Sequence, residues 1–440
     1  MNTKIGFISL GCPKNRVDSE VMLGILKEKG FTITSNENES DIIIINTCCF
    51  IKDAEQEALD TIQEFSLLKQ KGIIKKLIVT GCLVQRYKNK CLEKFPFVDA
   101  FIGTGEIASI DKIAFQVFEK KIIKVKEPKY LYNHTTPLIK TTPFYTSYVK
   151  IADGCDNRCS YCLIPFVRGS YRSRKINSIV KEVEKLKFSK EIILVSQDTT
   201  NYGKDIYGKN KLVSLLKNLS KISHVEWIRL MYTYPGHYTE EFIKYISENS
   251  KICRYLDIPI QHISSRILKK MNRKQDKKFI TNLLLKLKEK IPNISLRTSI
   301  LVGFPSETEK DFEELVNFIQ KIKFNKLGVF TYSNEKETPS SKIKNQISEK
   351  VKLERKDILM KIQQKISFEK NQEIVGKKIK VLIEGKKSQS LFIGRSEYDA
   401  PEIDGVVYVK PNKKNEPQIG EMVVVKITKG DEYDLYGKIS

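Results

Sequence analysis

Three cysteines within eight residues are the feature that most restricts how this chain can fold. Cys155, Cys159 and Cys162 form a C-x3-C-x2-C pattern, which is too tight for three separate strands and suits one loop around one metal centre. Thiolates select zinc, copper(I) or iron–sulfur clusters. Zinc normally needs a fourth Cys or His, and none is nearby in the sequence. A four-iron cluster on three cysteines leaves one iron open, so the pattern favours such a cluster over zinc or an inert loop.

The first third of the chain alternates strand patterns with helical patterns. Strands are expected at Lys4–Leu10, Asp41–Asn46 and Lys76–Thr80, and helices at about Val17–Lys29 and Asp53–Lys71. The second strand pattern is almost entirely β-branched, as in a strand that is buried on both faces. This βα repeat predicts a parallel sheet with right-handed crossovers.

A second group of cysteines follows these strands. Cys12, Cys48 and Cys82 each lie just past a strand, 36 and 34 residues apart, which is about one βα unit. Parallel strands end at one edge of a sheet, where open α/β sheets place ligands, so the three thiols can converge there. The alternative is three small core residues, because free cysteines are often buried. The cysteines interpreted as ordinary thiols are Cys49, Cys91 and Cys253.

The middle of the chain predicts a second α/β domain. Helical patterns such as Ile176–Phe188, Asp276–Lys290 and Glu307–Lys321 separate most of six strand patterns. Six βα units suit a partial (βα)6 barrel, with its active site at the C-terminal ends of the strands. The six expected strands are Ser147–Ile151, Glu191–Val195, Glu226–Met231, Arg254–Ile258, Ser295–Val302 and Leu327–Tyr332. A charged helix is expected at Asn345–Glu373.

The last 65 residues, Gly376–Ser440, differ from the rest. Their short alternating strands, broken by Gly, Pro and Asp-Gly, predict a small β-barrel. We therefore divide the chain into four parts. These are an N-terminal α/β domain (1–132), a linker with Pro and Thr (133–145), the barrel core with its trailing helix (146–375) and the terminal β-barrel (376–440).

Composition limits the setting and the partners. The net charge of +24 would suit ribosomes or RNA as partners, although the terminal module is nearly neutral, with 12 Lys and Arg against 10 Asp and Glu. No apolar run is long enough to cross a membrane, and the N-terminus lacks the parts of a signal peptide. We expect a cytoplasmic protein with no membrane partner. Its nine cysteines then indicate metal or redox chemistry rather than disulfides.

The cysteine loop, with Tyr161 before its last cysteine and in its place after the first barrel strand, resembles the radical S-adenosylmethionine enzymes. Segments Ser9–Asn15, Asn46–Ile51 and Thr80–Cys82 are similar to the three cysteine motifs of the methylthiotransferases in that superfamily. The resemblance covers essentially the whole chain, and it implies that the terminal barrel is TRAM-like.

This resemblance implies two [4Fe-4S] clusters and S-adenosyl-L-methionine as cofactors. One cluster, on Cys155, Cys159 and Cys162, would bind S-adenosylmethionine and generate a deoxyadenosyl radical. The auxiliary cluster would be held by Cys12, Cys48 and Cys82, with Cys48 rather than Cys49 as the ligand. The resemblance also assigns Tyr161, Gly303 and Pro305 to the cofactor site, although Ser306 stands where the family usually has Gly. It implies a low-potential electron donor, such as flavodoxin or ferredoxin, and a source of sulfur.

Methylthiotransferases modify either a tRNA adenosine beside the anticodon or the β-carbon of an aspartyl residue in small-subunit ribosomal protein S-twelve. Segments Tyr232–Pro235, Tyr255–His262 and, most closely, Asp399–Gly405 are similar to the second kind. We therefore expect aspartate methylthiolation of the ribosomal protein, with the tRNA adenosine as the alternative. A non-enzymatic iron–sulfur or RNA-binding module would not explain two sites that are each one ligand short.

Two groups of charged residues each allow two interpretations. Asp399, Glu402 and Asp404 lie on one expected loop of the neutral module, and they are predicted to dock a basic ribosomal protein. A solvated turn is the alternative for that loop, because Pro and Asp-Gly form turns. The arginines that follow the cysteine loop would either approach cofactor or substrate carboxylates or hold the loop through ion pairs. They are Arg168, Arg172 and Arg174.

Overall fold

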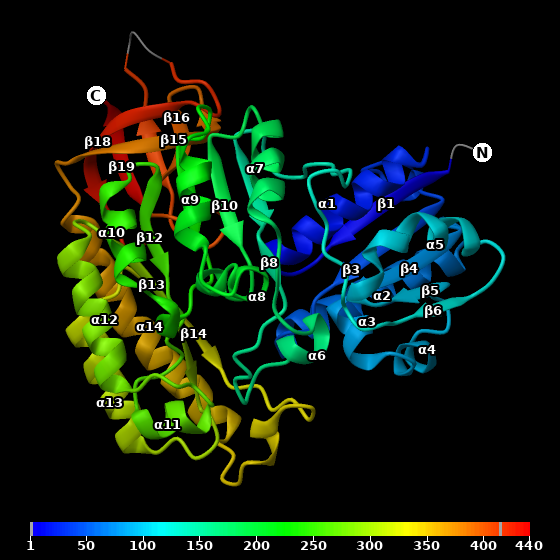
Figure 1. Ribbon diagram of the computed structural model, residues 1–440, viewed down its shortest axis with the longest axis horizontal. Coiled ribbons are helices and arrows are strands. Elements are labelled where there is room, and N and C mark those ends of the chain that lie inside the picture. Colours follow the sequence, from blue (N-terminus) through cyan, green and yellow to red (C-terminus); the bar gives the residue numbers. More distant parts are fainter. Residues whose placement is uncertain (1–2, 413–415) are drawn as a thin grey trace.

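The computed structural model describes residues 3–412 and 416–440 as three modules (Figure 1). The N-terminal α/β module lies at the right of Figure 1, the central module at the left, and the C-terminal β-barrel above the central module. No helix in this described part of the chain has both the length and the apolar character that crossing a bilayer requires.

The N-terminal module is built on a parallel sheet of six strands in the order β2-β1-β3-β4-β5-β6. The strands are β1 (Lys4–Ser9), β2 (Thr32–Ile33), β3 (Ile42–Thr47), β4 (Lys76–Gly81), β5 (Ala100–Ile102) and β6 (Ile122–Lys124). All six residues of β3 are buried, as its β-branched sequence predicted. Ser9 pairs with Asn46, and Thr47 with Gly81, so β1, β3 and β4 end at the same edge.

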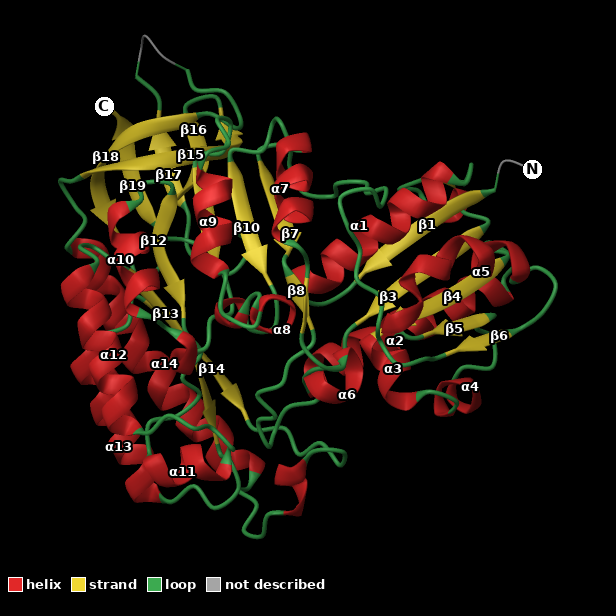
Figure 2. Cartoon of the chain, in the orientation of Figure 1, coloured by secondary structure: helices red, strands yellow, loops and turns green. Residues whose placement is uncertain are grey.

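Helices connect these strands and cover the sheet (Figure 2). They are α1 (Pro13–Glu28), α2 (Lys52–Gln70), α3 (Cys82–Tyr87), α4 (Lys90–Lys94) and α5 (Ile110–Gln116). Pro13 suits the start of α1, because the first turn of a helix needs no backbone donor from that residue. The expected parallel α/β arrangement is confirmed.

The central module has a second parallel sheet, in the order β14-β13-β12-β11-β10-β7. This open sheet of six strands confirms the expected partial barrel. The strands are β7 (Thr146–Lys150), β10 (Glu191–Val195), β11 (Trp227–Leu230), β12 (Ile252–Asp257), β13 (Ser295–Val302) and β14 (Lys326–Thr331). A short antiparallel pair, β8 (Ala152–Asp153) and β9 (Arg172–Ser173), stands apart from the sheet.

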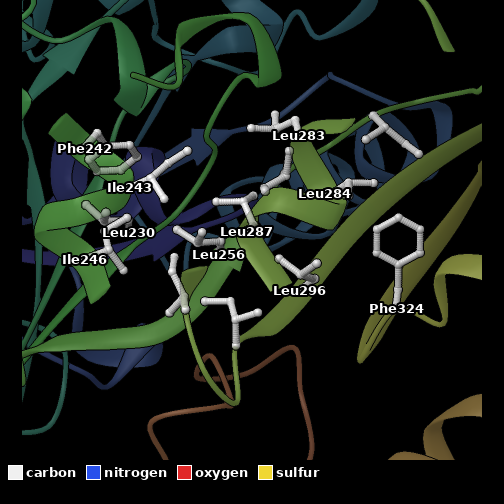
Figure 3. Packing of buried hydrophobic residues seen from close by; sticks show 14 of the residues in the cluster. Leu230, Phe242, Ile243, Ile246, Leu256, Leu283, Leu284, Leu287, Leu296 and Phe324 are labelled. Carbon is white, nitrogen blue, oxygen red and sulfur yellow. The ribbon is translucent and has the colours of Figure 1, made fainter. Parts of the chain in front are cut away.

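Most helices of the central module pack their apolar faces on this sheet, as Figure 3 shows for α10 and α12. The helices are α6 (Ile164–Arg168), α7 (Ile176–Lys185), α8 (Lys204–Tyr207), α9 (Leu212–Ser220), α10 (Glu240–Glu248), α11 (Ser265–Lys270), α12 (Lys277–Lys290), α13 (Glu309–Ile322) and α14 (Glu349–Gln372). Two of them do not pack on the sheet: α6 packs against the N-terminal module, and α8 has no buried residue. Helix α13 starts where it does because Thr308 and Asp311 form a reciprocal capping box. In Figure 3, Leu283, Leu284 and Leu287 of α12 lie over the strand side chains Leu256 and Leu296.

The C-terminal module is a closed barrel in the order β15-β16-β17-β19-β18. Its strands are β15 (Lys378–Ser388), β16 (Leu391–Ser396), β17 (Val407–Lys410), β18 (Met422–Gly430) and β19 (Leu435–Ile439). Pairing between β15 and β18 closes the barrel, so no strand edge stays open. This confirms the small β-barrel expected from the sequence.

The three modules share one apolar cluster. It contains Val17 of α1, Tyr255 of β12 and Ala400 of the C-terminal module. The segment 133–145, expected as a linker, carries no helix or strand. It is nevertheless fixed to α1, because Thr141 donates through its backbone N and its Oγ1 to Glu20 Oε1, over 2.7 and 2.8 Å.

Candidate functional site

The site is a cavity of about 490 Å³ that all three modules line. Ile403 is the contribution of the C-terminal module. Both groups of cysteines open onto this one cavity. The six are Cys12, Cys48, Cys82, Cys155, Cys159 and Cys162.

Strand ends position the first three cysteines. Cys12 directly precedes α1, Cys48 directly follows β3, and Cys82 is the first residue of α3 after β4. Two glycines permit this close approach. Gly11 has φ +88°, and a Cβ there would lie 2.5 Å from Cys48 Cβ; Gly81 has φ +99°, and its Cβ would lie 2.5 Å from a side-chain oxygen. Both positions therefore need the conformational freedom and the small size of glycine.

The second three cysteines lie on the irregular loop between β8 and α6. The backbone N of Cys155 donates to Gly169 O over 3.1 Å. Ser160 donates through its backbone N to Met271 O, 3.0 Å away, and through its Oγ to Lys270 O, 2.8 Å away. The loop is therefore held at its start by the segment after α6 and in its middle by the end of α11.

The donor sets fit clusters better than single ions. Among residues 3–412 and 416–440, no three Cys, His, Asp or Glu side chains are grouped closely enough for one metal ion. A single ion needs all its ligands around one centre, whereas a four-iron cluster takes one cysteine per iron. Burial raises the pKa of Cys48 and of Cys155 to about 12, so binding of a metal there displaces protons.

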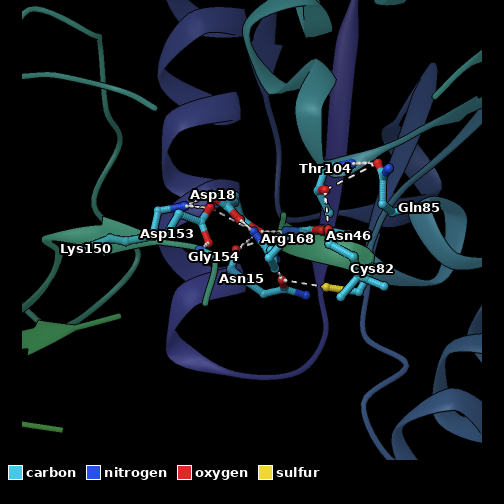
Figure 4. Close-up of polar contacts among 12 residues, drawn as sticks. Asn15, Asp18, Asn46, Cys82, Gln85, Thr104, Lys150, Asp153, Gly154 and Arg168 are labelled. Atoms are coloured by element: carbon cyan, nitrogen blue, oxygen red, sulfur yellow. Dashed lines mark hydrogen bonds and ion pairs between the residues drawn. The ribbon is translucent and has the colours of Figure 1, made fainter. Parts of the chain in front are cut away.

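A buried charge network links the end of α6, which follows the second group of cysteines, to the N-terminal module beside the first group (Figure 4). Arg168, at the end of α6, donates to Asp18 and to Asn15 Oδ1, and Asp18 also accepts from Lys150. Asn15 Nδ2 in turn donates to Thr47 O over 2.9 Å, next to Cys48. Arg168 and Asn15 thus connect the helix that follows the cysteine loop to the N-terminal sheet.

This network resolves the open interpretation of the three arginines in favour of structural contacts. Arg168 pairs with Asp18, and Arg174 pairs with the buried Glu182. Arg172 donates to the backbone carbonyls of Ser170 and Arg168. Of the three, Arg168 alone also lines the cavity.

The cavity has two chemically different ends. Cys159 is an electrostatic neighbour of Tyr161, Tyr234 and Arg273, and the guanidinium of Arg273 lies 4.7 Å from the Tyr234 ring centroid. At the other end, Cys12 is a neighbour of Lys14 and Tyr232. The sequence analysis gave no role to Arg273. This residue lies just after α11, close in sequence to Lys270 and Met271, whose backbone carbonyls hold the cysteine loop.

Of the three residues expected at the cofactor, Tyr161 lines the cavity, but Gly303 and Pro305 do not. Gly303 has φ +71°, and its backbone N donates to Glu307 Oε2 over 2.6 Å. A Cβ at Gly303 would lie 2.2 Å from Lys352 Cγ. The glycine is therefore required by the shape of the turn after β13, whatever the cofactor contacts.

The loop that carries Asp399, Glu402 and Asp404 does not form the exposed acidic surface that the sequence predicted. Asp399 and Asp404 are buried rather than presented to a partner. Asp399 pairs with Lys326 over 2.8 Å, and Asp404 accepts from Tyr255 Oη over 2.8 Å. Only Glu402 has a largely exposed carboxylate, and it pairs with Arg16 of α1 at 2.5 Å. Asp399 and Asp404 are needed to seat the loop, because Lys326 and Tyr255 would otherwise be buried without these partners.

Comparison with known proteins agrees with the three modules. Family models match residues 4–103 (Uncharacterized protein family UPF0004), 149–319 (Radical SAM superfamily) and 375–439 (TRAM domain). Among solved structures, the radical S-adenosylmethionine methyltransferase TsrM from Kitasatospora setae has a TM-score of 0.55 at 14% identity, covering 77% of this chain and 74% of that one. That likeness concerns the fold alone.

Two relatives carry the name ribosomal protein uS12 methylthiotransferase RimO. The one from Clostridioides difficile (strain 630) is 48% identical over 439 residues, which is 99% of this chain and 98% of the relative. The one from Lachnoclostridium phytofermentans is 48% identical over 438 residues, 99% of each chain. Identity at this level, from end to end and with all six cysteines opening onto one cavity, assigns the chain to the RimO methylthiotransferase family of the radical S-adenosylmethionine superfamily.

Proposed function

We propose that this protein methylthiolates the β-carbon of an aspartyl residue in ribosomal protein uS12, the small-subunit protein numbered twelve. The observation that carries the proposal is the single cavity onto which both groups of three cysteines open. The names of the relatives support the ribosomal protein as substrate. We do not retain the tRNA adenosine, since its main support was the overall net charge.

Six cysteines hold the two [4Fe-4S] clusters in this proposal. Cys155, Cys159 and Cys162 bind the cluster that takes S-adenosylmethionine, and Cys12, Cys48 and Cys82 bind the auxiliary cluster. When bound, these groups supply radical hydrogen abstraction and the transferred methylthio group. The protein itself has to bind the substrate between the two centres, orient it and exclude water.

The chain contains residues suited to each of these tasks. At the Cys159 end, Tyr161, Tyr234 and Arg273 form a stacked polar wall that can orient a small charged cofactor. At the mouth, Ile403 is 51% exposed and also lines the cavity. Together with Glu402, it is the part of the C-terminal loop that remains available to dock the substrate.

The remaining partners follow from the chemistry. The radical step needs a low-potential electron donor such as flavodoxin or ferredoxin, and repeated turnover needs a source of sulfur. Such donors and the ribosomal substrate are cytoplasmic, so we place the enzyme there. The basic character of the chain, with a net charge of +24, suits an acidic electron donor.

Anaerobic reconstitution of wild type and two triple variants tests this function. Wild type should hold about eight irons and methylthiolate purified uS12, as detected by mass spectrometry. Replacement of Cys155, Cys159 and Cys162 by Ala should leave about four irons and abolish cleavage of S-adenosylmethionine. Replacement of Cys12, Cys48 and Cys82 should also leave about four irons, retain cleavage and abolish methylthiolation.

Three results would contradict the assignment. A wild-type iron content near four would remove the auxiliary cluster. Methylthio transfer by the variant that lacks Cys12, Cys48 and Cys82 would show that sulfur comes from elsewhere. Modification of a tRNA stem-loop adenosine, with uS12 left unchanged, would reassign the substrate.

A further inference from the structure

One buried cation in the cavity has no carboxylate of its own. Lys14 lies in the first turn of α1, is 8% exposed and lines the cavity. Its Nζ lies 3.2 Å from the ring centroid of Tyr232, which comes from the segment after β11. Among residues 3–412 and 416–440, no Asp or Glu forms an ion pair with Lys14. The side-chain contact of its ammonium is with the Tyr232 ring.

The acidic residues near Lys14 are already engaged. Asp257 accepts from Arg297 Nη1 over 2.7 Å and from the backbone N of Tyr232 over 3.0 Å. Asp153 accepts from Lys150 at 3.2 Å. By contrast, the neighbouring buried cations Lys150 and Arg168 both pair with Asp18. Lys14 thus lacks the carboxylate partner that these two cations have, and its main attractive charge interaction is with Cys12.

An unmatched buried ammonium is costly unless an anion reaches it. The cation–ring contact offsets part of that cost, but a ring cannot replace a counter-ion. Because Lys14 faces a cavity rather than packed side chains, an anionic ligand can approach it. The local geometry therefore indicates a subsite for a carboxylate.

The position of this subsite distinguishes between two carboxylates. The attractive charge interaction that affects Lys14 most is with Cys12, which belongs to the auxiliary group of cysteines and lies two residues before it. Cys159, where S-adenosylmethionine is expected, has Tyr161, Tyr234 and Arg273 as neighbours instead. The carboxylate next to Lys14 is therefore one that enters between the centres, on the side of the sulfur-bearing cluster.

We propose that Lys14, supported by the Tyr232 ring, binds the side-chain carboxylate of the aspartyl residue that is modified. This proposal rests on the proposed function. The β-carbon is one bond away from that carboxylate, so an ion pair at Lys14 holds the reacting carbon at the auxiliary end. It also selects aspartate over asparagine, because a neutral amide would leave the ammonium unmatched.

The test is a double-mutant cycle between enzyme and substrate. Wild type and Lys14→Gln are each assayed with uS12 and with uS12 in which the modified aspartate is asparagine. Wild type should bind the aspartyl form on the order of 100-fold more tightly, because it desolvates a matched charge pair. In Lys14→Gln this preference should disappear, and Lys14→Arg should restore most of it.

Two controls separate binding from structure. Lys27→Gln removes an exposed charge from the same helix and should leave the preference unchanged. Iron content and substrate-free formation of 5′-deoxyadenosine should be the same in Lys14→Gln as in wild type. Affinity for S-adenosylmethionine should also be unchanged.

Several outcomes would overturn the proposal. One is that Lys14→Gln retains the full preference for the aspartyl form. Another is that every Lys14 variant loses auxiliary iron, which would indicate a purely structural role for Lys14. Weaker binding of S-adenosylmethionine, with the uS12 preference intact, would place the cofactor's carboxylate at Lys14. A wild-type enzyme that leaves uS12 unmodified would refute the proposed function itself, and this subsite with it.

Discussion

Replacement of Glu191 by Gln should weaken the attachment of the C-terminal barrel to the central sheet. Glu191, the first residue of β10, is fully buried between two arginines. Its Oε1 accepts from Arg229 Nε over 2.7 Å and from Arg395 Nη1 over 3.1 Å, and Oε2 accepts from Arg395 as well. Arg395 belongs to β16, so this carboxylate joins two modules.

The magnitude follows from two independent arguments. Burial alone would raise the pKa of Glu191, but Arg395 and Arg229 lower it to about 2 from an ordinary 4.5. That shift corresponds to roughly 3 kcal/mol of stabilisation of the charged form. Removal of one partner from a buried ion pair independently costs about 3–5 kcal/mol. We expect Glu191→Gln to lower the free energy of unfolding by about 3 kcal/mol.

The pH dependence has a definite sign. Because the pKa in the folded state lies below the ordinary value, this stabilisation is complete above about pH 4.5 and is lost as the pH falls towards 2. The difference between wild type and Glu191→Gln should therefore be constant from about pH 6 to pH 8.

Fluorescence of Trp227 during anaerobic urea unfolding measures the effect. Trp227 is the single tryptophan of the chain and pairs with Glu191 across β10 and β11. The matched control is Glu226→Gln, which breaks the exposed pair Glu226–Lys380 between the same two modules and should cost less than about 1 kcal/mol. The reasoning fails if the two variants lose similar stability, or if the effect of Glu191→Gln changes across neutral pH.

Three further predictions concern single substitutions. Cys49→Ser should keep about eight irons, whereas Cys48→Ser should lose auxiliary iron, as measured by iron analysis. Gly81→Ala should reduce auxiliary iron and lower the melting temperature, because its φ of +99° and a contact at 2.5 Å exclude a Cβ; normal iron content would contradict this. Asp399→Asn should cost about 1–3 kcal/mol in thermal denaturation, and Glu402→Gln less than about 1 kcal/mol; equal losses would contradict the assigned burial.

The arrangement of the cysteines was predictable because it depends on local patterns. The strand pattern at Asp41–Asn46 located the edge at which Cys48 lies. The parallel pairing of β3 with β1 and β4 brings Cys12 and Cys82 to the same edge. The spacing of the C-x3-C-x2-C pattern was sufficient to predict that its three cysteines lie on one loop. The first signal repeats with each of three strands, and the second lies within eight residues of the chain.

Contacts between distant segments were not predictable in the same way. Lys14 and Tyr232 are more than two hundred positions apart, and nothing in either segment specifies that the ring will cover the ammonium. The acidic loop shows the same limit. Composition identified its charges correctly, but only the packing of the barrel on β12 and β14 shows that Asp399 and Asp404 are internal ion-pair and hydrogen-bond partners.

One departure from the family pattern, Ser306, lies at a position whose backbone geometry favours glycine. Ser306 stands where glycine is usual and has φ +70°, in the left-handed region that favours glycine. Its backbone N donates to Asn345 O over 2.8 Å, and its Oγ to Lys344 O over 3.2 Å. These contacts stabilise the strained residue, so the substitution changes the turn rather than the cavity.

The buried charge networks indicate how this enzyme controls the distance between its two centres. Arg168 ties the N-terminal sheet to the cysteine loop, and Glu191 ties the central sheet to the C-terminal barrel. Reactive groups that must act on the same carbon lose much of their rate when misplaced by about 1 Å, so flexible hinges between the modules would be costly. The substrate must then enter through the rim rather than by separation of modules. The exposed apolar side chains that line the cavity, Phe50, Phe330 and Ile403, come one from each module. A loop of uS12 that brings an aspartate to Lys14 should therefore carry an apolar residue next to it, because such a neighbour would bury these three side chains on binding.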